Sequence, residues 1–164
     1  MQIQVGDDMP KATFKYLGSD GPLDVVDIAS DNLCVGKKVA LFGLPGAFTP
    51  VCNGKHLPGF INSVSEIKSR GVDLVACVSG SDPFTMASWA KGLGAGNDIL
   101  MLSDHTAEFT KAIGLEVDLS AFGLGSRSER YSMIITNGVI EALNIEDSIL
   151  VCDVSSGEEL LGSL

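Results

Sequence analysis

The chain has 164 residues, 45% of them hydrophobic and 20% charged, which predicts one globular domain over residues 1–164. Eleven Lys and Arg residues against 21 Asp and Glu residues give a formal net charge of -10, so most of the surface would repel nucleic acid and anionic membranes. The sequence has no apolar run long enough to span a membrane and no signal-peptide pattern at its start. We therefore expect a cytoplasmic protein, or an organellar one if a transit peptide has been removed, that binds neither nucleic acid nor membrane.

The four cysteines, at positions 34, 52, 77 and 152, are far apart and irregularly spaced. They form neither the Cys-x-x-Cys pairs of a zinc site nor the dense pattern of a secreted disulfide scaffold. A chain of this length can also bury a core without disulfides or metal ions. We expect no metal site, and any cysteine with a function should act through the reactivity of its thiol.

Strand and helix patterns alternate along the first two thirds of the chain. Two short strands, at 12–17 and 25–28, are expected to form an N-terminal β-hairpin. The elements that follow are strand 39–42, helix 58–69, strand 72–79, helix 83–91, strand 99–102 and helix 106–113. The runs at 39–42 and 72–79 are nearly all apolar, as expected for strands that are buried on both faces of a sheet.

The last third of the chain predicts a hairpin and a final helix. Asn137 and Gly138 stand between apolar runs at 131–136 and 139–143, which is the strongest short signal for a β-hairpin. A short helix is expected at 156–161. This order of elements favours an α/β fold of the thioredoxin-like kind, with a mixed central sheet and helices on both faces.

The stretch with the clearest chemical meaning is residues 42–52, FGLPGAFTPVC, where a buried strand leads through a Pro/Gly loop into the start of a helix. Cys52 stands in the first turn of that helix, where free N–H groups and the helix dipole stabilise a thiolate relative to a thiol. The hydroxyl of Thr49 can reach the same sulfur and does not itself ionise. The pattern Thr-x-x-Cys therefore predicts a single reactive thiol where a dithiol oxidoreductase has Cys-x-x-Cys.

The run PGAFTPVCNGKHLPGF at 45–60 resembles the active-site motif of the peroxiredoxins, specifically the type II or peroxiredoxin-5 subfamily with its PGAFTPxC and HLPGF signatures. The resemblance continues through 72–89, 128–133 and 137–144, so it covers nearly the whole chain. The stretch SGSD at 79–82 departs from the Val-Asn-Asp run usual in the family. The resemblance implies reduction of hydrogen peroxide and alkyl hydroperoxides by a peroxidatic cysteine.

The resemblance also implies which residues form the site. Cys52 would be the peroxidatic cysteine, and Thr49 and Pro45 would shape its pocket. Arg130, otherwise readable as a solvated charge at the end of a strand, would approach the sulfur from the opposite strand. Its guanidinium would stabilise the thiolate and hold the two oxygens of a hydroperoxide in line for displacement. The expected lining of the substrate pocket is Gly46, Phe48 and His56.

The two histidines give weaker signals. His56 stands four residues after Cys52, which suggests a Cys-His pair, but that geometry needs an unbroken helix and Pro58 argues against one. We therefore expect a structural role for His56 or a place at the rim of the pocket. His105 is expected to be a loop or cap residue.

Two cysteines are candidates to resolve the sulfenic acid formed on Cys52. In plant-like type II members the resolving cysteine lies in the strand after the peroxidatic helix, where Cys77 stands. In animal-like members it lies near the C-terminus, close to Cys152, which is the less favoured of the two. Cys77 is equally readable as a small core residue, so the alternatives stay open. Cys34, in the loop-like stretch 31–36, is expected to be incidental.

The sequence thus predicts a thiol-dependent peroxidase without a bound cofactor, which takes electrons from glutathione and glutaredoxin or from thioredoxin. A homodimer is expected to cover the rim of the site, because the family resemblance and the apolar residues Phe48, Phe84 and 122–125 point to a buried contact there. One alternative is a redox-regulated binding or chaperone-like module that is switched by oxidation of Cys52. A weaker alternative is a Cys-His hydrolase.

Overall fold

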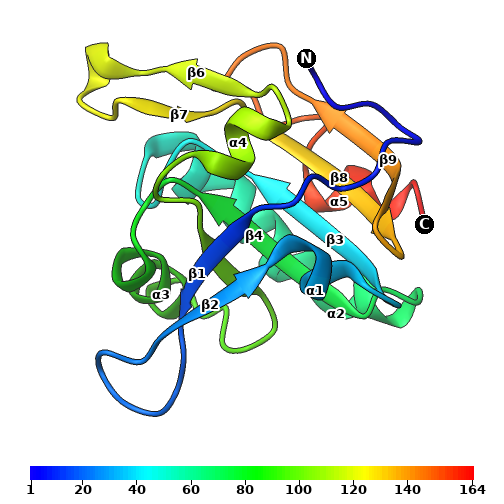
Figure 1. The fold of residues 1–164 in the computed structure, drawn as a ribbon, viewed down its shortest axis with the longest axis horizontal. Coiled ribbons are helices and arrows are strands. Elements are labelled where there is room, and N and C mark those ends of the chain that lie inside the picture. Colours follow the sequence, from blue (N-terminus) through cyan, green and yellow to red (C-terminus); the bar gives the residue numbers. More distant parts are fainter.

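The computed structural model describes residues 1–164, and a seven-stranded mixed sheet lies at its centre (Figure 1). The strands of this sheet are β1 (Thr13–Leu17), β2 (Val25–Ala29), β3 (Lys38–Gly43), β4 (Leu74–Ser79), β5 (Leu100–Ser103), β8 (Tyr131–Thr136) and β9 (Val139–Ile145). They are ordered β2-β1-β5-β4-β3-β8-β9. A second, two-stranded sheet, β6 (Glu116–Asp118) with β7 (Ser126–Ser128), projects at the upper left of Figure 1, and a 3₁₀ turn at Ser120–Phe122 lies between its strands.

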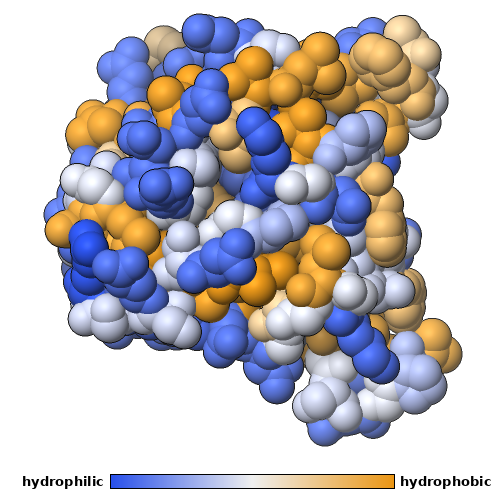
Figure 2. Space-filling view, turned by 180° about the vertical axis from the view of Figure 1, so that it is seen from behind, coloured by the Kyte–Doolittle hydropathy of each residue, from blue (hydrophilic) through white to orange (hydrophobic).

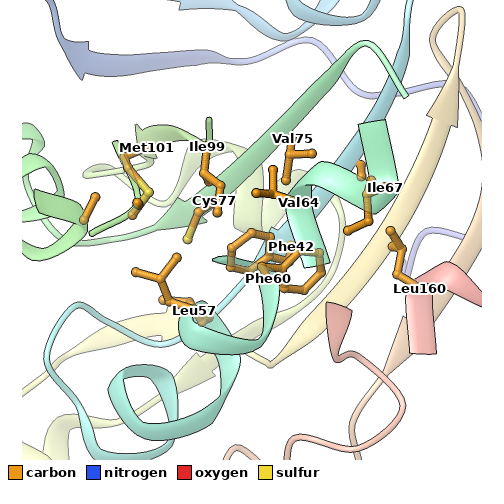
Figure 3. Packing of buried hydrophobic residues seen from close by; sticks show 14 of the residues in the cluster. Phe42, Leu57, Phe60, Val64, Ile67, Val75, Cys77, Ile99, Met101 and Leu160 are labelled. Atoms are coloured by element: carbon orange, nitrogen blue, oxygen red, sulfur yellow. The ribbon is translucent and has the colours of Figure 1, made fainter. Parts of the chain in front are cut away.

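Helices cover both faces of the large sheet. They are α1 (Ser30–Cys34), α2 (Leu57–Ser69), α3 (Pro83–Gly92), α4 (Glu108–Ala112) and α5 (Gly157–Leu161). Because side chains alternate along a strand, Phe42 of β3 faces the cluster formed with α2, α3 and α5, while Leu41 faces the cluster formed with α1 and α4. Figure 3 shows the first cluster, in which the rings of Phe42 and Phe60 are stacked with centroids 3.8 Å apart.

The pairing of the strands brings the ends of β3, β4 and β5 and the start of β8 to one edge of the sheet. β3, β4 and β5 are parallel, so their carboxyl ends lie together. β8 is antiparallel to β3, and Gly43 at the end of β3 pairs with Tyr131 at the start of β8. Arg130, which precedes Tyr131, is therefore held beside the loop that follows β3.

The predicted α/β architecture, with its N-terminal hairpin β1–β2 and the hairpin β8–β9, is confirmed. Two local predictions are wrong. The stretch around Cys34 forms the short helix α1 rather than a loop. Pro58 does not interrupt the helix, because helical turns run from Cys52 into α2 and Pro58 stands in the first turn of α2. None of the helices is long and apolar enough to cross a membrane.

Candidate active site

The segment between β3 and α2 turns sharply before Cys52. Phe48 has a left-handed backbone, with φ of 64°, and the N–H of Asn53 then donates to the carbonyl of Thr49 to begin the helix. Residues Cys52–His56 form a π-helical turn, η1, in which the N–H of Leu57 donates to the carbonyl of Cys52. The indole N–H of Trp89 in α3 donates to the side-chain oxygen of Asn53 at 2.9 Å and fixes this turn.

Cys52 is fully buried and contacts a buried arginine. The Nη2 of Arg130 donates to the Sγ of Cys52 at 3.2 Å, and only 2% of the Arg130 surface is exposed. None of the five ion pairs in the structure includes Arg130. No carboxylate therefore neutralises the guanidinium, and its charge is available to a thiolate on Cys52.

Neutral acceptors hold the rest of the Arg130 guanidinium in place. Nε and Nη2 donate to the carbonyl of Ile149 at 3.1 and 2.8 Å, and Nη1 lies 3.0 Å from the Nδ1 of His56. Since arginine can only donate, Nδ1 must accept, and the proton of the imidazole lies on Nε2, 3.0 Å from the carbonyl of Ser155. Burial and the Arg130 charge lower the pKa of His56 to about 3, so the ring is neutral at neutral pH.

The carbonyls of Ile149 and Ser155 belong to the C-terminal segment 146–156, which is organised by Glu146. Its carboxylate accepts hydrogen bonds from the N–H of Asp153, the N–H of Ser155 and the Ser155 hydroxyl at 2.6 to 2.8 Å. Burial alone would raise the pKa of Glu146, but these hydrogen bonds outweigh it and hold the pKa below its usual range. The ionised carboxylate thus positions both carbonyls that fix Arg130 and His56.

The loop before Cys52 is held by contacts that differ from the expected one. The hydroxyl of Thr49 donates to the carbonyl of Gly46 at 2.7 Å rather than to the sulfur of Cys52. Its oxygen keeps lone pairs that can accept a hydrogen bond from a substrate O–H. The N–H of Ala47 donates to the hydroxyl of Ser81 at 3.1 Å, and Arg127 donates to the carbonyl of Pro45 at 2.8 Å.

The predicted pocket residues separate into two groups. Pro45, Gly46 and Phe48 lie in the loop before Cys52, and Phe48 is 58% exposed, with its ring 6.2 Å from that of Trp89. The prediction that His56 lies at the rim of the pocket is wrong, because its side chain is fully buried. Its two nitrogens bind the Ser155 carbonyl and the Arg130 guanidinium, and neither binds Cys52. The same contacts leave no imidazole nitrogen for a Cys-His hydrolase. His105 lies in an exposed turn.

The other three cysteines are buried in different places. Cys77 lies in β4, in the same cluster as Cys52, and Figure 3 shows it among Leu57, Ile99 and Met101. Burial, and next a charge on Cys52, raise the pKa of Cys77 well above its usual value. Cys152 lines a surface pocket with Lys55 and Gly59, outside both clusters. Cys34 lies on the opposite face of the sheet, and burial raises its pKa to about 11.

Sequence reasoning missed several residues that hold the site together: Ser81, Arg127, Glu146, Ile149 and Ser155. Ile149 and Ser155 act through backbone carbonyls, so their side chains carry no signal. Arg127 does carry a sequence signal, because it is one of only three arginines in the chain and stands three residues before Arg130.

Comparisons with known proteins agree with this geometry. The redoxin family profile matches residues 4–161. The chain is 47% identical over 166 residues to peroxiredoxin-2E-2, chloroplastic, of Oryza sativa subsp. japonica, which covers 99% of this chain and 72% of that protein. It is 44% identical to reduced Prx3 of Vibrio vulnificus in complex with H2O2, with a TM-score of 0.92 and 99% of each chain covered. Peroxiredoxin 5 of Alvinella pompejana is 33% identical, with a TM-score of 0.83 and coverage of 98% of this chain and 97% of that one. The chain therefore belongs to the redoxin family as a type II, peroxiredoxin-5-like peroxiredoxin with a thioredoxin-like fold, and it is a thiol-dependent peroxidase.

Proposed function

We propose that Cys52 is the peroxidatic cysteine, and the contact between its sulfur and Arg130 carries this assignment. The thiolate attacks the terminal oxygen of a hydroperoxide, ROOH. A bond between sulfur and oxygen forms as the O–O bond breaks, and RO⁻ leaves and takes up a proton to give water or an alcohol. Sulfur is thereby oxidised to a sulfenic acid, Cys52–SOH.

The groups around Cys52 fit the charge that moves in this step. The Nη2 of Arg130, which donates to the sulfur in the resting site, is placed to donate to the attacked oxygen as the bond to sulfur forms. The oxygen of Thr49 is free to accept the hydroperoxide O–H, since its own proton goes to Gly46. Donors that grip the separating oxygens more tightly in the transition state than in the ground state lower the barrier.

Replacing the thiol tests the assignment directly. We expect Cys52→Ser to lose the rapid reaction with hydrogen peroxide, measured by stopped flow through the fluorescence of Trp89, the single tryptophan. Cys34→Ser is the matched control, because it removes a buried thiol on the other face of the sheet. Full activity in Cys52→Ser would refute the assignment. The comparisons do not favour the redox-regulated module, and a wild-type rate no faster than that of free cysteine would be needed to restore it.

For the second half of the cycle we propose Cys77 as the resolving cysteine. It shares a core cluster with Cys52, and the charge on Cys52 affects its pKa, whereas Cys152 faces an outer pocket. A disulfide needs Cα atoms within about 7 Å. Both thiols are buried in the packed core, and we propose that η1 unwinds during the cycle to bring Cys52 to Cys77 in β4.

Peptide mapping after one equivalent of hydrogen peroxide tests the resolving cysteine. We expect an intramolecular link between Cys52 and Cys77, together with faster hydrogen exchange over 50–60 in the disulfide form. A link between Cys52 and Cys152 would place resolution in the C-terminal segment. Over-oxidised or glutathionylated Cys52 with free Cys77 would show a one-cysteine mechanism.

We propose that turnover needs no bound cofactor and that an external thiol supplies the electrons. The family requires a thiol reductant. Glutathione with glutaredoxin and thioredoxin are the two candidates, and one coupled assay that compares their rates at equal concentration distinguishes them.

The compartment is the remaining part of the proposal. The sequence alone predicts a cytoplasmic protein, or an organellar one after removal of a transit peptide. The rice relative is named as a chloroplastic protein, and this supports the organellar alternative. Fractionation of cells that express the natural protein, followed by detection in organelles and cytosol, tests it.

A further inference from the structure

Arg127, in β7, is a second arginine beside the active-site loop and has no assigned role. Its Nη1 donates to the carbonyl of Pro45 at 2.8 Å and contacts the hydroxyl of Ser81 at 3.3 Å, and its Nε donates to the carbonyl of Leu124 at 3.0 Å. It takes part in none of the five ion pairs. Because this half-buried cation donates only to neutral oxygens, its role is to hold those oxygens in place and not to pair with a carboxylate.

Two glycines leave the space that Arg127 occupies. A Cβ on Gly46 would lie 2.7 Å from the Nη1 of Arg127, and a Cβ on Gly80 would lie 2.9 Å from its Cδ. Both distances are too short for real contacts, so any larger residue at either position would push the guanidinium away. The absence of a side chain at Gly46 and at Gly80 thus leaves room for Arg127.

Arg127 and Ser81 together hold the loop 45–47 at both ends. Arg127 binds the carbonyl of Pro45, and the Ser81 hydroxyl binds the N–H of Ala47. Ser81 is in turn fixed by Ser79, whose hydroxyl lies 3.3 Å away, and by Ser103, which donates to the Ser81 carbonyl. This serine network uses the stretch SGSD, in which the sequence departs from the usual family pattern.

The restrained loop leads directly to the reaction centre. Gly46, between the two anchored residues, offers the carbonyl that accepts the hydroxyl of Thr49. A shift of the loop would therefore turn the Thr49 hydroxyl away from its present direction. Burial lowers the pKa of Arg127, and negative charge on Cys52 opposes that shift, which agrees with a guanidinium close to the thiolate.

We propose that Arg127 is a positioning residue for peroxide reduction, which clamps the loop 45–47 against Ser81 and through it orients the Thr49 hydroxyl. The proposal rests on the function proposed above for Cys52. Arg127 does not touch the reacting atoms. Its contribution to the rate should therefore pass through Thr49 and disappear when the Thr49 hydroxyl is absent.

The test measures the second-order rate constant for hydrogen peroxide in single and double variants of the whole chain. We expect Arg127→Gln to slow the reaction by about tenfold, in line with the loss of a charged hydrogen bond. Arg127→Lys, which keeps a cationic donor for Pro45, should react faster than Arg127→Gln. In a Thr49→Val background, Arg127→Gln should cause no further loss, because two residues that act through one contact are not additive.

Gly80→Ala supplies a test that leaves the arginine in the sequence. The added methyl group displaces the flexible Arg127 side chain, so this variant should be slowed in the same way, and Arg127→Gln should add nothing to it. Arg70→Gln is the matched control, since Arg70 also bonds a carbonyl, that of Leu161, but lies on the surface at the far end of α2. We expect it to react like the wild type.

Wild-type rates in both Arg127→Gln and Gly80→Ala would overturn the proposal, and so would a full tenfold loss on top of Thr49→Val. These outcomes are distinct from a failure of the proposed function. That failure would show as a slow wild-type protein, or as full activity of Cys52→Ser.

Discussion

At the scale of a single residue, Arg130 is a buried charge that remains free to interact with a thiolate on Cys52. Its acceptors are the Cys52 sulfur, a ring nitrogen of His56 and the backbone carbonyl of Ile149, and none of them is a carboxylate. A carboxylate in their place would satisfy the same donors but would also cancel the charge. Because His56 is neutral, the site gains one net positive charge, which a thiolate on Cys52 compensates.

The first prediction concerns the Thr49 hydroxyl, which binds Gly46 and leaves its oxygen free to accept. Thr49→Val removes the hydroxyl at almost constant volume, so we expect the reaction with hydrogen peroxide to slow by about tenfold or more. Thr49→Ser keeps the hydroxyl and should retain most of the rate. Stopped-flow traces that are equal for the Val variant and the wild type would remove the hydroxyl from the mechanism.

The second prediction concerns His56 and acid stability. Its pKa is lowered from 6.5 to about 3 in the folded protein, chiefly by burial and next by Arg130. Between these two pH values the unfolded chain binds a proton that the folded chain does not. The free energy of unfolding is therefore unaffected by His56 above about pH 6.5 and decreases as the pH falls below that value. The slope is about 1.4 kcal/mol per pH unit.

Urea unfolding between pH 7 and pH 5 measures this slope. His56→Gln offers an amide oxygen to Arg130 and cannot titrate, so its free energy of unfolding should change less over the same range. Parallel loss in the wild type and the variant would show that His56 is not the group responsible.

The candidate site was predictable from sequence only where chemistry is carried by side chains in a local motif. Cys52, Thr49 and Pro45 fall in one continuous run, and the strand register then brings Arg130 to them. The carbonyls of Ile149 and Ser155 could not be found in this way, because any residue supplies a carbonyl and only the folded path of the chain places it.

At the scale of elements, the C-terminal segment 146–156 acts as a support for the site. It has almost no regular structure, and its shape depends on the three hydrogen bonds that the Glu146 carboxylate accepts. Through the carbonyl of Ile149 this shape fixes Arg130, and through that of Ser155 it fixes His56. A single carboxylate thus controls the geometry of two buried side chains.

The third prediction follows for Glu146→Gln. An amide in place of the carboxylate should lower the free energy of unfolding at pH 7 by about 1–3 kcal/mol and slow the peroxide reaction. Since the folded pKa of Glu146 is lowered, its contribution is present above the unfolded pKa and is lost as the pH falls through the folded pKa. The difference between wild type and variant should therefore shrink in acid.

Urea unfolding at pH 7 and pH 4 provides the measurement for Glu146, with Glu158→Gln as an exposed control. If the difference between Glu146→Gln and the wild type were the same at both pH values, ionisation of Glu146 would not be its cause.

The regular elements differ in how well the sequence predicts them. A continuous apolar run of a few residues is typical of a strand buried on both faces, and this pattern predicts β3 and β4. The β8–β9 hairpin is predictable because Asn137 and Gly138 suit its tight turn, where both have positive φ. Helix α1 and strands β6 and β7 are not predictable in this way, because α1 has no capping side chain and β6 and β7 have only three residues each, which is too few to show a period. Tertiary contacts decide such short segments.

At the scale of the whole molecule, charge and exposed apolar residues have opposite effects on association. The net charge of -10 favours solubility and opposes unspecific contacts. Figure 2 shows apolar groups scattered among polar ones over one face, with a concentration along the upper margin. Three phenylalanines are exposed: Phe48 at 58%, Phe84 at 43% and Phe122 at 71%.

We predict that a homodimer buries these phenylalanines. Phe48 lies in the loop before Cys52, Phe84 opens α3 directly after the Ser81 network, and Phe122 lies in the 3₁₀ turn between β6 and β7. Each is thus on a segment that borders the site, so a symmetric contact would also enclose the peroxide pocket and exclude water from it.

Sedimentation at micromolar concentration should give the mass of a dimer. Phe84→Glu and Phe122→Glu should shift it to the monomer, since each places a charge in an apolar contact. Leu23→Glu, at a still more exposed apolar residue in the loop between β1 and β2, should leave the dimer intact. A monomeric wild type would contradict the prediction.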